Sequence, residues 1–438
     1  MRQAAVHDFI AIGLGPFNLS LACLAEPVDG LNGAFLEQRA GFDWHPGMLL
    51  DGAGMQTPFL ADLVSLADPT SRFSFLNYLK QQGRLYPFYI RENFFPLRAE
   101  FNDYCQWAAR QLPSIHFQRR VERIDWQDGV YRLSVRHGGE METWLAHKLV
   151  LGTGTVPSLP ACCDGLGERV IHSADYLANK LRLQMQPSIT VLGSGQSAAE
   201  IYFDLLQDID RFGYRLDWIT RSPRFYPLEY TKLTLEMTSP EYIDYFHALP
   251  TARRDRLIES QKGLYKGINR TLIDQIFDLL YQKRLQGGCD TRLMTNTALT
   301  ACRDHGGRAG LTLDLLQCEQ QQAFSLDTAR LVAATGYEYR QPACLAGIED
   351  RLRRDAQGRL DVTRDYAVDS AGREIFVQNV GLYSHGLATP DLGMACYRNA
   401  CLLRALTGRE IYPVETRIAF QTFGVPDARL PQDHACLA

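Results

Sequence analysis

Two short apolar runs along the chain each lead into a glycine-rich turn and then into a segment with helical spacing of apolar residues. The first unit has its apolar run at residues 9–12 and its helical face at 19–24. The second repeats this order at 188–192 and 196–206. A continuous apolar run bounded by turn residues is typical of a buried strand, so each unit is predicted as strand, tight turn and helix.

The two turns have the spacing of dinucleotide-binding turns. Glycines at the first and third positions let the backbone approach a pyrophosphate held at the N-terminus of the following helix. One such turn indicates a nucleotide site, whereas two indicate a redox enzyme that uses two dinucleotides. Asn18 replaces the third glycine of the first turn, which leaves a simple tight turn as the alternative there. The turns are Gly13-Leu14-Gly15-Pro16-Phe17-Asn18 and Gly193-Ser194-Gly195-Gln196-Ser197-Ala198.

The residue that follows the second strand differs between the units. The apolar run 33–36 ends at Glu37, where a carboxylate can accept hydrogen bonds from a ribose hydroxyl. The run 215–220 ends instead at Arg221. A guanidinium pairs with a 2′-phosphate, which a carboxylate would repel, so the second unit is predicted to prefer NADPH. The alternative is that Arg221 and Arg224 are solvated residues of a turn.

Two further strand-like runs, 149–155 and 331–337, end in Thr-Gly turns and flank the second unit. Such turns suit chain crossings between two nucleotide domains. The simplest architecture inserts the second domain into the first. Residues 225–290 have helical periodicity and are predicted to form a mostly helical substrate region.

The predicted fold class is therefore α/β, with two Rossmann-like domains and this small helical region. An FAD domain is expected from residues 1–170 and 336–438, and an NADPH domain from 171–335.

Composition supports a protein that handles small molecules. A formal net charge of -4 and 22% charged residues give no bias toward nucleic acid or a membrane surface. The N-terminus lacks the apolar core of a signal peptide, and no apolar run is long enough to span a membrane, so a cytoplasmic location is expected. The 11 cysteines include no CxxC pair, which argues against a disulfide framework, a zinc site and a dithiol flavoenzyme. No metal site is predicted.

Several motifs agree on one family. The chain resembles the microbial N-hydroxylating flavin monooxygenases, the lysine and ornithine N-monooxygenases of siderophore biosynthesis. The family pattern has asparagine at the position of Asn18, and the resemblance runs in family order over nearly the whole chain. Five stretches carry it: Gly13 to Leu19, Trp44-His45-Pro46-Gly47-Met48, Met55-Gln56-Thr57-Pro58-Phe59-Leu60, Gly193 to Glu200, and His385-Gly386-Leu387.

The resemblance implies FAD and NADPH as cofactors and a C4a-hydroperoxyflavin that hydroxylates a neutral amine while NADP⁺ stays bound. An alkyl amine has a pKa of about 10.4, so the pocket must favour the neutral form. The expected partners are a small-molecule amine and O₂. A homo-oligomer, tetramer or dimer, is also implied.

Carried over residue by residue, the resemblance assigns Gln56 to the oxygen-activating side of the flavin and Asn269 to contact with substrate and NADP⁺. These two are the predicted catalytic residues. Each has a structural alternative: Gln56 as an amide that satisfies backbone groups, Asn269 as a helix cap, and Trp44 and Met48 as core. His385 is interpreted as a structural hydrogen-bonding residue near the flavin. The predicted cofactor-binding residues are Gly13, Gly15, Pro16, Asn18, Glu37, Trp44, His45, Met48, Gln56, Gly193, Gly195, Gln196, Ser197, Arg221, Thr335, His385, Gly386 and Leu387.

The chain departs from the amino-acid hydroxylases of this family at two positions. Ala61 stands where those enzymes have a lysine that pairs with the substrate carboxylate, and Leu235 replaces a substrate-contacting asparagine. A carboxylate left buried without its partner costs about 3–5 kcal/mol. A short diamine, cadaverine or putrescine, is therefore the predicted substrate. Glu236 and Asp391 are the candidates for its far ammonium group, which completes the predicted substrate-binding set of Ala61, Leu235, Glu236, Asn269 and Asp391.

Other readings stay open. Another cation could do the work of the missing lysine, which would leave L-lysine or L-ornithine as substrate. A Baeyer–Villiger or sulfur-oxidising monooxygenase also carries two glycine turns, but it lacks the Met55-Gln56 run. A flavin-binding sensor or assembly protein without turnover is the alternative from another functional class.

Overall fold

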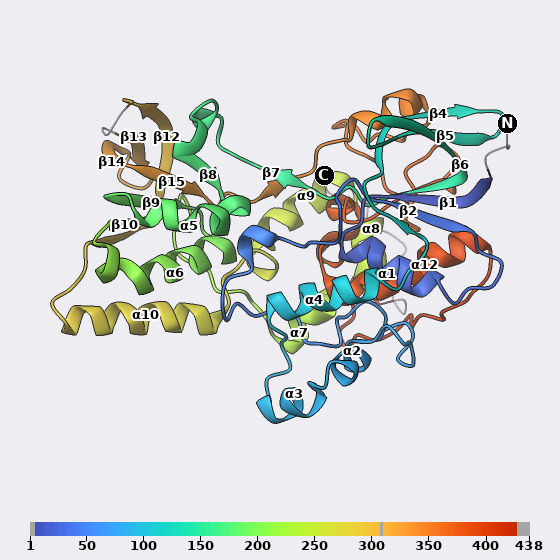
Figure 1. Cartoon of the computed structure of the whole chain (residues 1–438), viewed down its shortest axis with the longest axis horizontal. Coiled ribbons are helices and arrows are strands. Elements are labelled where there is room, and N and C mark those ends of the chain that lie inside the picture. Colours follow the sequence, from blue (N-terminus) through green and yellow to red (C-terminus); the bar gives the residue numbers. More distant parts are fainter. Residues whose placement is uncertain (1–4, 307–309, 427–438) are drawn as a thin grey trace, which may run out of the picture.

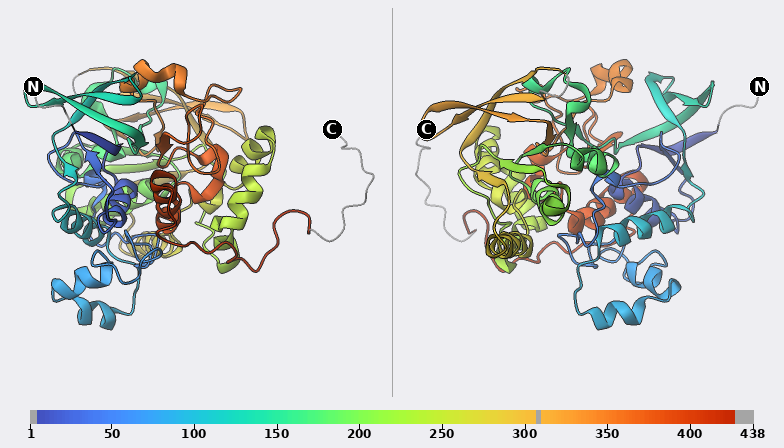
Figure 2. Two further views of the ribbon diagram at one scale, coloured as in Figure 1. Left: turned by 90° about the vertical axis from the view of Figure 1, so that its right-hand side faces the viewer. Right: turned by 60° about the vertical axis from the view of Figure 1, so that its left-hand side comes forward.

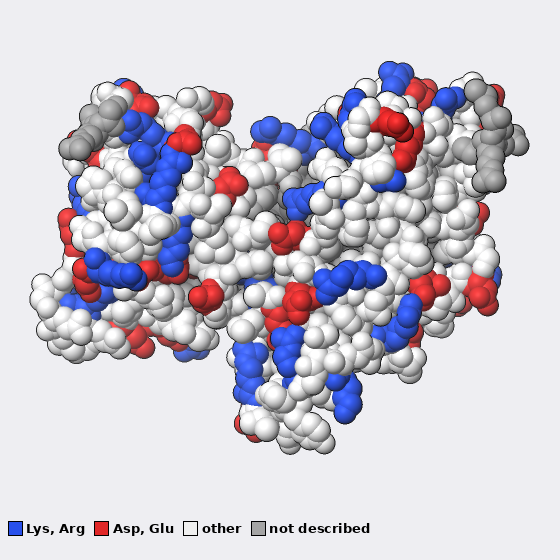
Figure 3. Space-filling model, in the orientation of Figure 1, with Lys and Arg blue, Asp and Glu red and all other residues white. Residues whose placement is uncertain are grey.

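The computed structural model describes residues 5–306 and 310–426, so residues 1–4 and 427–438 of the predicted FAD domain lie outside it. The two largest sheets lie in separate lobes (Figure 1). None of the helices in the described ranges combines the length and apolar character that crossing a bilayer requires. Lysine and arginine are interspersed with acidic residues over the face drawn in Figure 3.

The first sheet has the order β3-β2-β1-β6-β5-β4, with β17 also paired to β6. Strands β1, β2, β3, β6 and β17 pair in parallel, whereas β4, β5 and β6 form an antiparallel meander. These strands are β1 (Val6–Ile12), β2 (Gly33–Leu36), β3 (Ile115–His116), β4 (Arg120–Gln127), β5 (Val130–His137), β6 (Glu140–Leu151) and β17 (Ile375–Val377).

The second sheet has the order β11-β10-β9-β15-β8 and is parallel throughout. A three-stranded antiparallel sheet, β12-β13-β14, covers one of its faces through a shared apolar cluster. A short antiparallel ladder of β7 and β16 lies where the chain crosses between the lobes (Figure 1). These strands are β7 (Val156–Pro157), β8 (Val170–His172), β9 (Ser188–Leu192), β10 (Arg215–Ile219), β11 (Thr291–Met294), β12 (Thr297–Asp304), β13 (Leu311–Gln317), β14 (Gln322–Thr328), β15 (Arg330–Ala333) and β16 (Tyr337–Glu338).

Helices cover the remaining faces and form a separate helical region. Helices α1, α4 and α12 pack on the first sheet, and α5, α6 and α10 pack on the second. Helices α7, α8 and α9 belong to the helical region. The helices are α1 (Pro16–Ala25), α2 (Phe75–Gln81), α3 (Leu85–Arg91), α4 (Arg98–Ala109), α5 (Tyr176–Gln184), α6 (Gln196–Phe212), α7 (Lys232–Leu235), α8 (Pro240–Ala248), α9 (Thr251–Ser260), α10 (Arg270–Leu285), α11 (Leu382–His385) and α12 (Ala395–Thr407).

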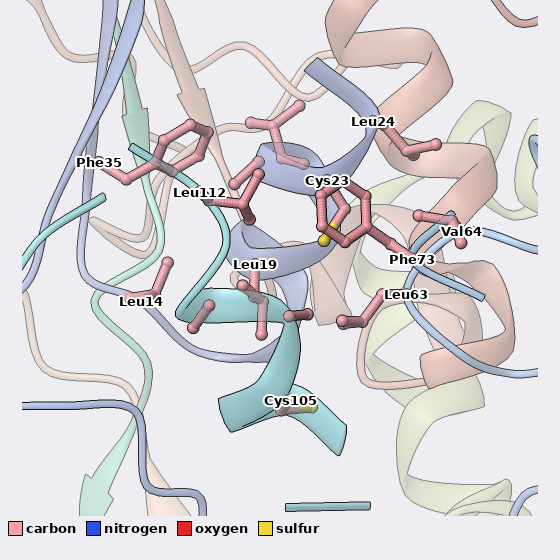
Figure 4. Close-up of a cluster of buried hydrophobic side chains, with 14 of the residues drawn as sticks. Leu14, Leu19, Cys23, Leu24, Phe35, Leu63, Val64, Phe73, Cys105 and Leu112 are labelled. Atoms are coloured by element: carbon pink, nitrogen blue, oxygen red, sulfur yellow. The ribbon is translucent and has the colours of Figure 1, made fainter. Parts of the chain in front are cut away.

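Strand β1 shows why the sequence predicted a buried strand. Its residues Phe9 and Ala11 join the apolar cluster of α1 and α12, which Figure 4 shows, while Ile10 and Ile12 join a second cluster on the opposite face. Successive side chains of a strand point to opposite faces, so a strand covered on both sides needs apolar residues at every position.

The predicted elements are present. Strands 9–12, 33–36 and 188–192 correspond to β1, β2 and β9, and helices begin after both glycine turns. Region 225–290 contains α7 to α10. The runs 149–155 and 331–337 end in turns as expected: β6 ends at Leu151 and β15 at Ala333, and the Thr-Gly turn after each leads the chain into the crossing strands β7 and β16.

Candidate active site

The first glycine turn leaves the N-terminus of α1 open. A side chain at Gly13, whose φ is 84°, would come within 2.5 Å of the Gly152 carbonyl oxygen, so the turn fits tightly against the end of β6. A Cβ at Gly15, in contrast, would meet no atom within 4 Å, and Gly15 places no side chain over the first turn of α1. The free backbone N–H groups there suit a pyrophosphate.

Glu37 is anchored beside this turn. The buried carboxylate accepts hydrogen bonds from the Leu14 N–H (2.7 Å) and the Arg39 N–H (2.8 Å). These bonds fix the carboxylate at the end of β2, next to the turn. Its remaining lone pairs suit ribose hydroxyl groups.

Asn18 fills the place of the third glycine by bracing the turn. Its Nδ2 donates to the Gly13 carbonyl oxygen (2.7 Å), and a side chain at Gly152 would lie 2.2 Å from that nitrogen. Its Oδ1 is buried without a hydrogen-bond partner in the described protein. A buried acceptor without a donor is costly, so this oxygen fits a site that a ligand completes.

The run Trp44–Met48 joins the two lobes. The 3-10 helix η1 (Pro46–Met48) packs on η4 (Ser173–Asp175) of the second lobe, and a side chain at Gly47 would lie only 1.8 Å from the Ala174 carbonyl oxygen. His45 has a left-handed backbone with φ 51°. Desolvation by the surrounding chain, together with the positive charges of Arg98 and Arg39, lowers the pKa of His45 to about 4, so the imidazole is neutral at pH 7.

Gln56 and Asn269 meet at Gln196, the first residue of α6. The Gln196 Oε1 accepts a hydrogen bond from the Asn269 N–H (2.8 Å) and a longer one from the Gln56 Nε2 (3.4 Å). The Asn269 side chain caps α10 by accepting from the Thr271 N–H (2.9 Å), which leaves its NH₂ group available. Three predicted site residues from distant parts of the sequence are thus brought together.

A buried ion pair extends this network between the lobes. Arg98 of α4 donates from both terminal nitrogens to Glu200 of α6 (2.7 and 2.8 Å), and also to the Met48 carbonyl oxygen (2.7 Å). Glu200 accepts a further bond from the Gln196 Nε2 (2.9 Å). The pair holds the second glycine turn against the predicted flavin-contacting run.

The second glycine turn repeats the geometry of the first. A side chain at Gly193 would approach the Ala334 carbonyl oxygen to 2.3 Å. Gly195 is the N-cap of α6 and provides no capping side chain, and Gln196 and Ser197 are the first residues of the helix. Arg221 is exposed after β10 and makes no ion pair with the described residues. A free guanidinium beside an open helix N-terminus fits a phosphorylated ribose.

Thr335 lies at the crossing between the lobes, and His385 lies beside the helical region. Both make hydrogen bonds to other groups of the protein. The Thr335 hydroxyl donates to the Ser158 carbonyl oxygen across the β7–β16 ladder. The His385 Nε2 donates to the Arg364 carbonyl oxygen (3.1 Å), and its Nδ1 lies 2.8 Å from the Ser384 hydroxyl. Gly386, with φ 61°, lies against the Phe246 ring, and Leu387 is buried.

The predicted substrate residues have different surroundings. Ala61 is buried, and Leu235 is 36% exposed. Glu236 bonds to the C-terminal segment: its carboxylate accepts from the backbone N–H groups of Phe420 (2.9 Å) and Gln421 (3.0 Å). Of the two candidates for the far ammonium group, Glu236 thus has structural partners in the C-terminal segment.

Asp391 has an oxygen available. Its Oδ1 accepts from the Gly393 N–H (2.8 Å), whereas its Oδ2 makes no hydrogen bond to the described residues. Burial raises the pKa of this carboxyl group above its usual value, and the Gly393 N–H and the nearby Arg398 only partly oppose this shift. Tyr230 lies close enough to Asp391 for the carboxylate to raise the pKa of its phenol, in addition to the effect of burial.

Similarity to known proteins identifies the family. A family model described as L-lysine 6-monooxygenase/L-ornithine 5-monooxygenase matches residues 5–339. The chain belongs to this family. The prediction made from the five motif stretches is therefore confirmed.

Individual members of the family resemble the chain over nearly its whole length. The putrescine N-hydroxylase of Shewanella oneidensis is 54% identical over 422 residues, which cover 95% of this chain and 84% of that protein. The FAD-bound cadaverine monooxygenase of the desferrioxamine pathway of Erwinia amylovora is 58% identical, with a TM-score of 0.95 over 97% of this chain and 100% of that one. The ornithine N-hydroxylase of Kutzneria sp. 744, solved with reduced FAD, NADP⁺ and L-ornithine, has a TM-score of 0.86 at 28% identity and covers 93% of this chain and 100% of that one. The predicted α/β fold of a flavin monooxygenase is thereby confirmed.

The sequence did not predict the ion pair of Glu200 and Arg98, which joins the two lobes. Glu200 is the last residue of the motif stretch at the second turn, but the sequence does not indicate that its partner is Arg98. Arg98 lies in a helix without any motif, and only the packing of the lobes reveals it. In the described part of the chain, no cluster of acidic, histidine or cysteine side chains is arranged to hold a metal ion.

Proposed function

We propose that this protein is an FAD- and NADPH-dependent monooxygenase that hydroxylates one primary amine of a short aliphatic diamine, cadaverine or putrescine, in hydroxamate siderophore biosynthesis. The observation that carries the proposal is the buried Ala61. A methyl group stands there in place of a cation that could pair with an amino-acid carboxylate. The names of the relatives from Shewanella oneidensis and Erwinia amylovora support the same substrate class.

FAD is proposed to bind at the first glycine turn. Gly13, Gly15 and Pro16 would hold the pyrophosphate, Glu37 the ribose, and Trp44, His45, Met48 and Gln56 the flavin side. Support comes from the open N-terminus of α1 and from the partnerless Asn18 Oδ1. When bound, FAD supplies the activation of O₂, which no side chain of the protein can perform.

NADPH is proposed to bind at the second turn through Gly193, Gly195, Gln196 and Ser197, with Arg221 on the 2′-phosphate. The corresponding domains are 1–170 with 336–438 for FAD and 171–335 for NADPH, while 225–290 contributes the substrate region. The sheets support this division, because the first takes its strands from 6–151 and 375–377 and the second from 170–333.

The substrate is proposed to lie between these sites, with Asn269 beside the reacting amine. The protein must keep this amine neutral, and an apolar wall with Ala61 and Leu235 disfavours its charged form. Asp391 would hold the distal ammonium group through its available Oδ2, since Glu236 is occupied by the C-terminal segment. A carboxylate at the far end of the pocket attracts a diamine and repels an amino acid.

Steady-state assays test the proposal. NADPH oxidation and hydroxylamine product are measured with putrescine, cadaverine, L-ornithine and L-lysine, and only the diamines should give coupled turnover. Asp391→Asn should raise the KM for the diamine by about tenfold or more, because a charge-assisted hydrogen bond is lost. Hydroxylation of lysine or ornithine with efficiency comparable to either diamine contradicts the proposal.

We also propose a homo-oligomer, tetramer or dimer, in the cytoplasm. The exposed apolar residues Phe277, Tyr281 and Leu285 are spaced four apart along α10 and support contact between chains. The described cysteines are all free, which suits a reducing compartment.

A further inference from the structure

The C-terminal segment after α12 spans two parts of the molecule. Near its start, the Tyr412 hydroxyl donates to the Leu24 carbonyl oxygen in the last turn of α1 (2.8 Å), and Arg409 donates to the Asp29 carbonyl oxygen in the loop that follows α1 (3.1 Å). Figure 2 shows the segment leaving α12 and running past the helices of the helical region. We call residues 412–424 the strap.

Two carboxylates of the helical region hold the strap by its backbone. Glu236 accepts from the N–H groups of Phe420 and Gln421, and the Gln421 side chain donates to Glu236 (2.9 Å) and to the Leu233 carbonyl oxygen (2.7 Å). Glu241 accepts from Ile418 (2.6 Å) and Ala419 (3.0 Å). Four consecutive backbone N–H groups are therefore satisfied by two acids.

An aromatic contact adds to these hydrogen bonds. The Phe423 ring meets Tyr242 edge to face at 4.9 Å and lies 6.5 Å from Tyr245. Phe423 joins an apolar cluster with Tyr242 and Phe246 of α8, Met237, and Leu382 of α11. The strap thus packs on the outer side of the same cluster that supports α11.

The inner side of this region faces the proposed active site. The segment η5 (Glu236–Thr238) packs on η8 (Gly386–Ala388), and Phe246 lies against Gly386. A displacement or disorder of α7 and η5 would therefore also displace the His385-Gly386-Leu387 motif and the part of the substrate wall that contains Leu235.

We propose that the strap fixes the substrate wall and that Glu236 is a positioning residue that acts through the strap, not a ligand of the amine. This inference rests on the proposed function for the identity of the substrate, but not for the existence of the strap. An acid that binds backbone N–H groups on the outer surface orders α7 and η5 without touching the reacting atoms. Loss of this contact should weaken amine binding while the NADPH site stays intact.

Two strap variants and one control in the full-length protein test the proposal. Glu236→Gln removes the charge that holds Phe420 and Gln421, and Phe423→Ala removes the aromatic contact while Glu236 stays in place. Glu415→Gln is the control, because Glu415 is an exposed strap residue without a hydrogen bond to the described side chains. All three are compared for FAD content, melting temperature, KM for the diamine, KM for NADPH, and hydroxylamine formed per NADPH.

Both Glu236→Gln and Phe423→Ala should raise the amine KM by about tenfold and release more peroxide per NADPH, with the NADPH KM and FAD content unchanged. Glu415→Gln should behave as the parent protein. An increase with Glu236→Gln alone would show that Glu236 contacts the amine, and an unchanged KM in both variants would show that the strap has no role in binding. Either result overturns the proposal.

Hydrogen–deuterium exchange without amine gives a readout that does not depend on turnover. Amides of residues 233–248 should exchange faster in both strap variants, whereas amides of β1 and β9 should not change. Unchanged exchange at 233–248 contradicts the strap, even if no diamine is hydroxylated. A protein that shows the exchange pattern but hydroxylates no diamine would contradict the proposed function alone.

Discussion

At the scale of single residues, the site depends on where charge is present and where it is missing. Ala61 lacks a cation, Asp391 keeps an available oxygen, and Arg221 is a cation without a partner in the described chain. Burial makes the first two decisive, since an unpaired charge costs far more inside a protein than at its surface.

Arg221 provides a test of cofactor choice. Arg221→Ala should raise the KM for NADPH by about 10- to 100-fold, because a bidentate pair with the 2′-phosphate is lost, and should leave the KM for NADH unchanged. Stopped-flow reduction of the flavin measures both. Arg224→Ala is the matched control, since Arg224 lies over the Tyr226 ring at 4.6 Å. An equal rise of the KM for NADPH and the KM for NADH would show that Arg221 supports the fold only.

His385 predicts a pH dependence of stability. It is fully buried, and burial together with His247, Arg364 and Arg398 lowers its pKa well below the usual 6.5. The unfolded chain therefore binds a proton that the folded protein rejects. The contribution of neutral His385 to the free energy of unfolding is complete above about pH 6.5. It is lost as the pH falls below this value, by at most about 1.4 kcal/mol per pH unit.

Chemical denaturation from pH 5 to 8 measures this effect. His385→Gln should reduce the acid-side slope of the free energy of unfolding relative to the parent protein, because one titrating group is gone. Equal slopes in the two proteins would show that His385 is not held neutral.

At the scale of elements, the buried pair between α4 and α6 joins the lobes. Arg98→Met or Glu200→Leu should each lower the free energy of unfolding by about 3–5 kcal/mol, because the remaining charge is left buried. The double variant should cost less than the sum of the two. Denaturant unfolding gives all four values.

The exposed pair Arg123–Asp125 is the control for this cycle. Breaking it should cost at most about 1 kcal/mol, since water solvates both charges. Additive effects at Arg98 and Glu200 would contradict direct coupling across the lobes.

Local sequence explains the elements better than it explains their contacts. The strands β1, β2 and β9 and the helices after both turns follow from apolar spacing and glycine positions. The pairing of Arg98 with Glu200 does not, because it joins residues 102 apart in the chain. Glu236 shows the same limit: it was a candidate for the far ammonium group of the substrate, whereas its hydrogen bonds go to residues near the C-terminus, which carries no motif.

At the scale of the whole molecule, two lobes with largely parallel sheets and a helical region surround the proposed site. The polar network of Arg98, Glu200, Gln196, Gln56 and Asn269 runs between the lobes, and the strap closes the outer side of the helical region. In the proposed function, this arrangement would bring residues between 56 and 391 to one small substrate. In that function, cofactor binding would rest on the turns, whereas substrate choice would rest on Ala61 and Asp391.

Competition between substrates in one vessel tests the central claim most directly. Equimolar putrescine, cadaverine, L-ornithine and L-lysine are supplied with NADPH and O₂, and mass spectrometry measures the N-hydroxylated products, whose ratios equal the ratios of kcat/KM. We expect the diamine products to exceed the amino-acid products by about a hundredfold or more, as a cost of about 3–5 kcal/mol for an unpaired carboxylate requires. Comparable amounts of hydroxylated lysine or ornithine would contradict the account.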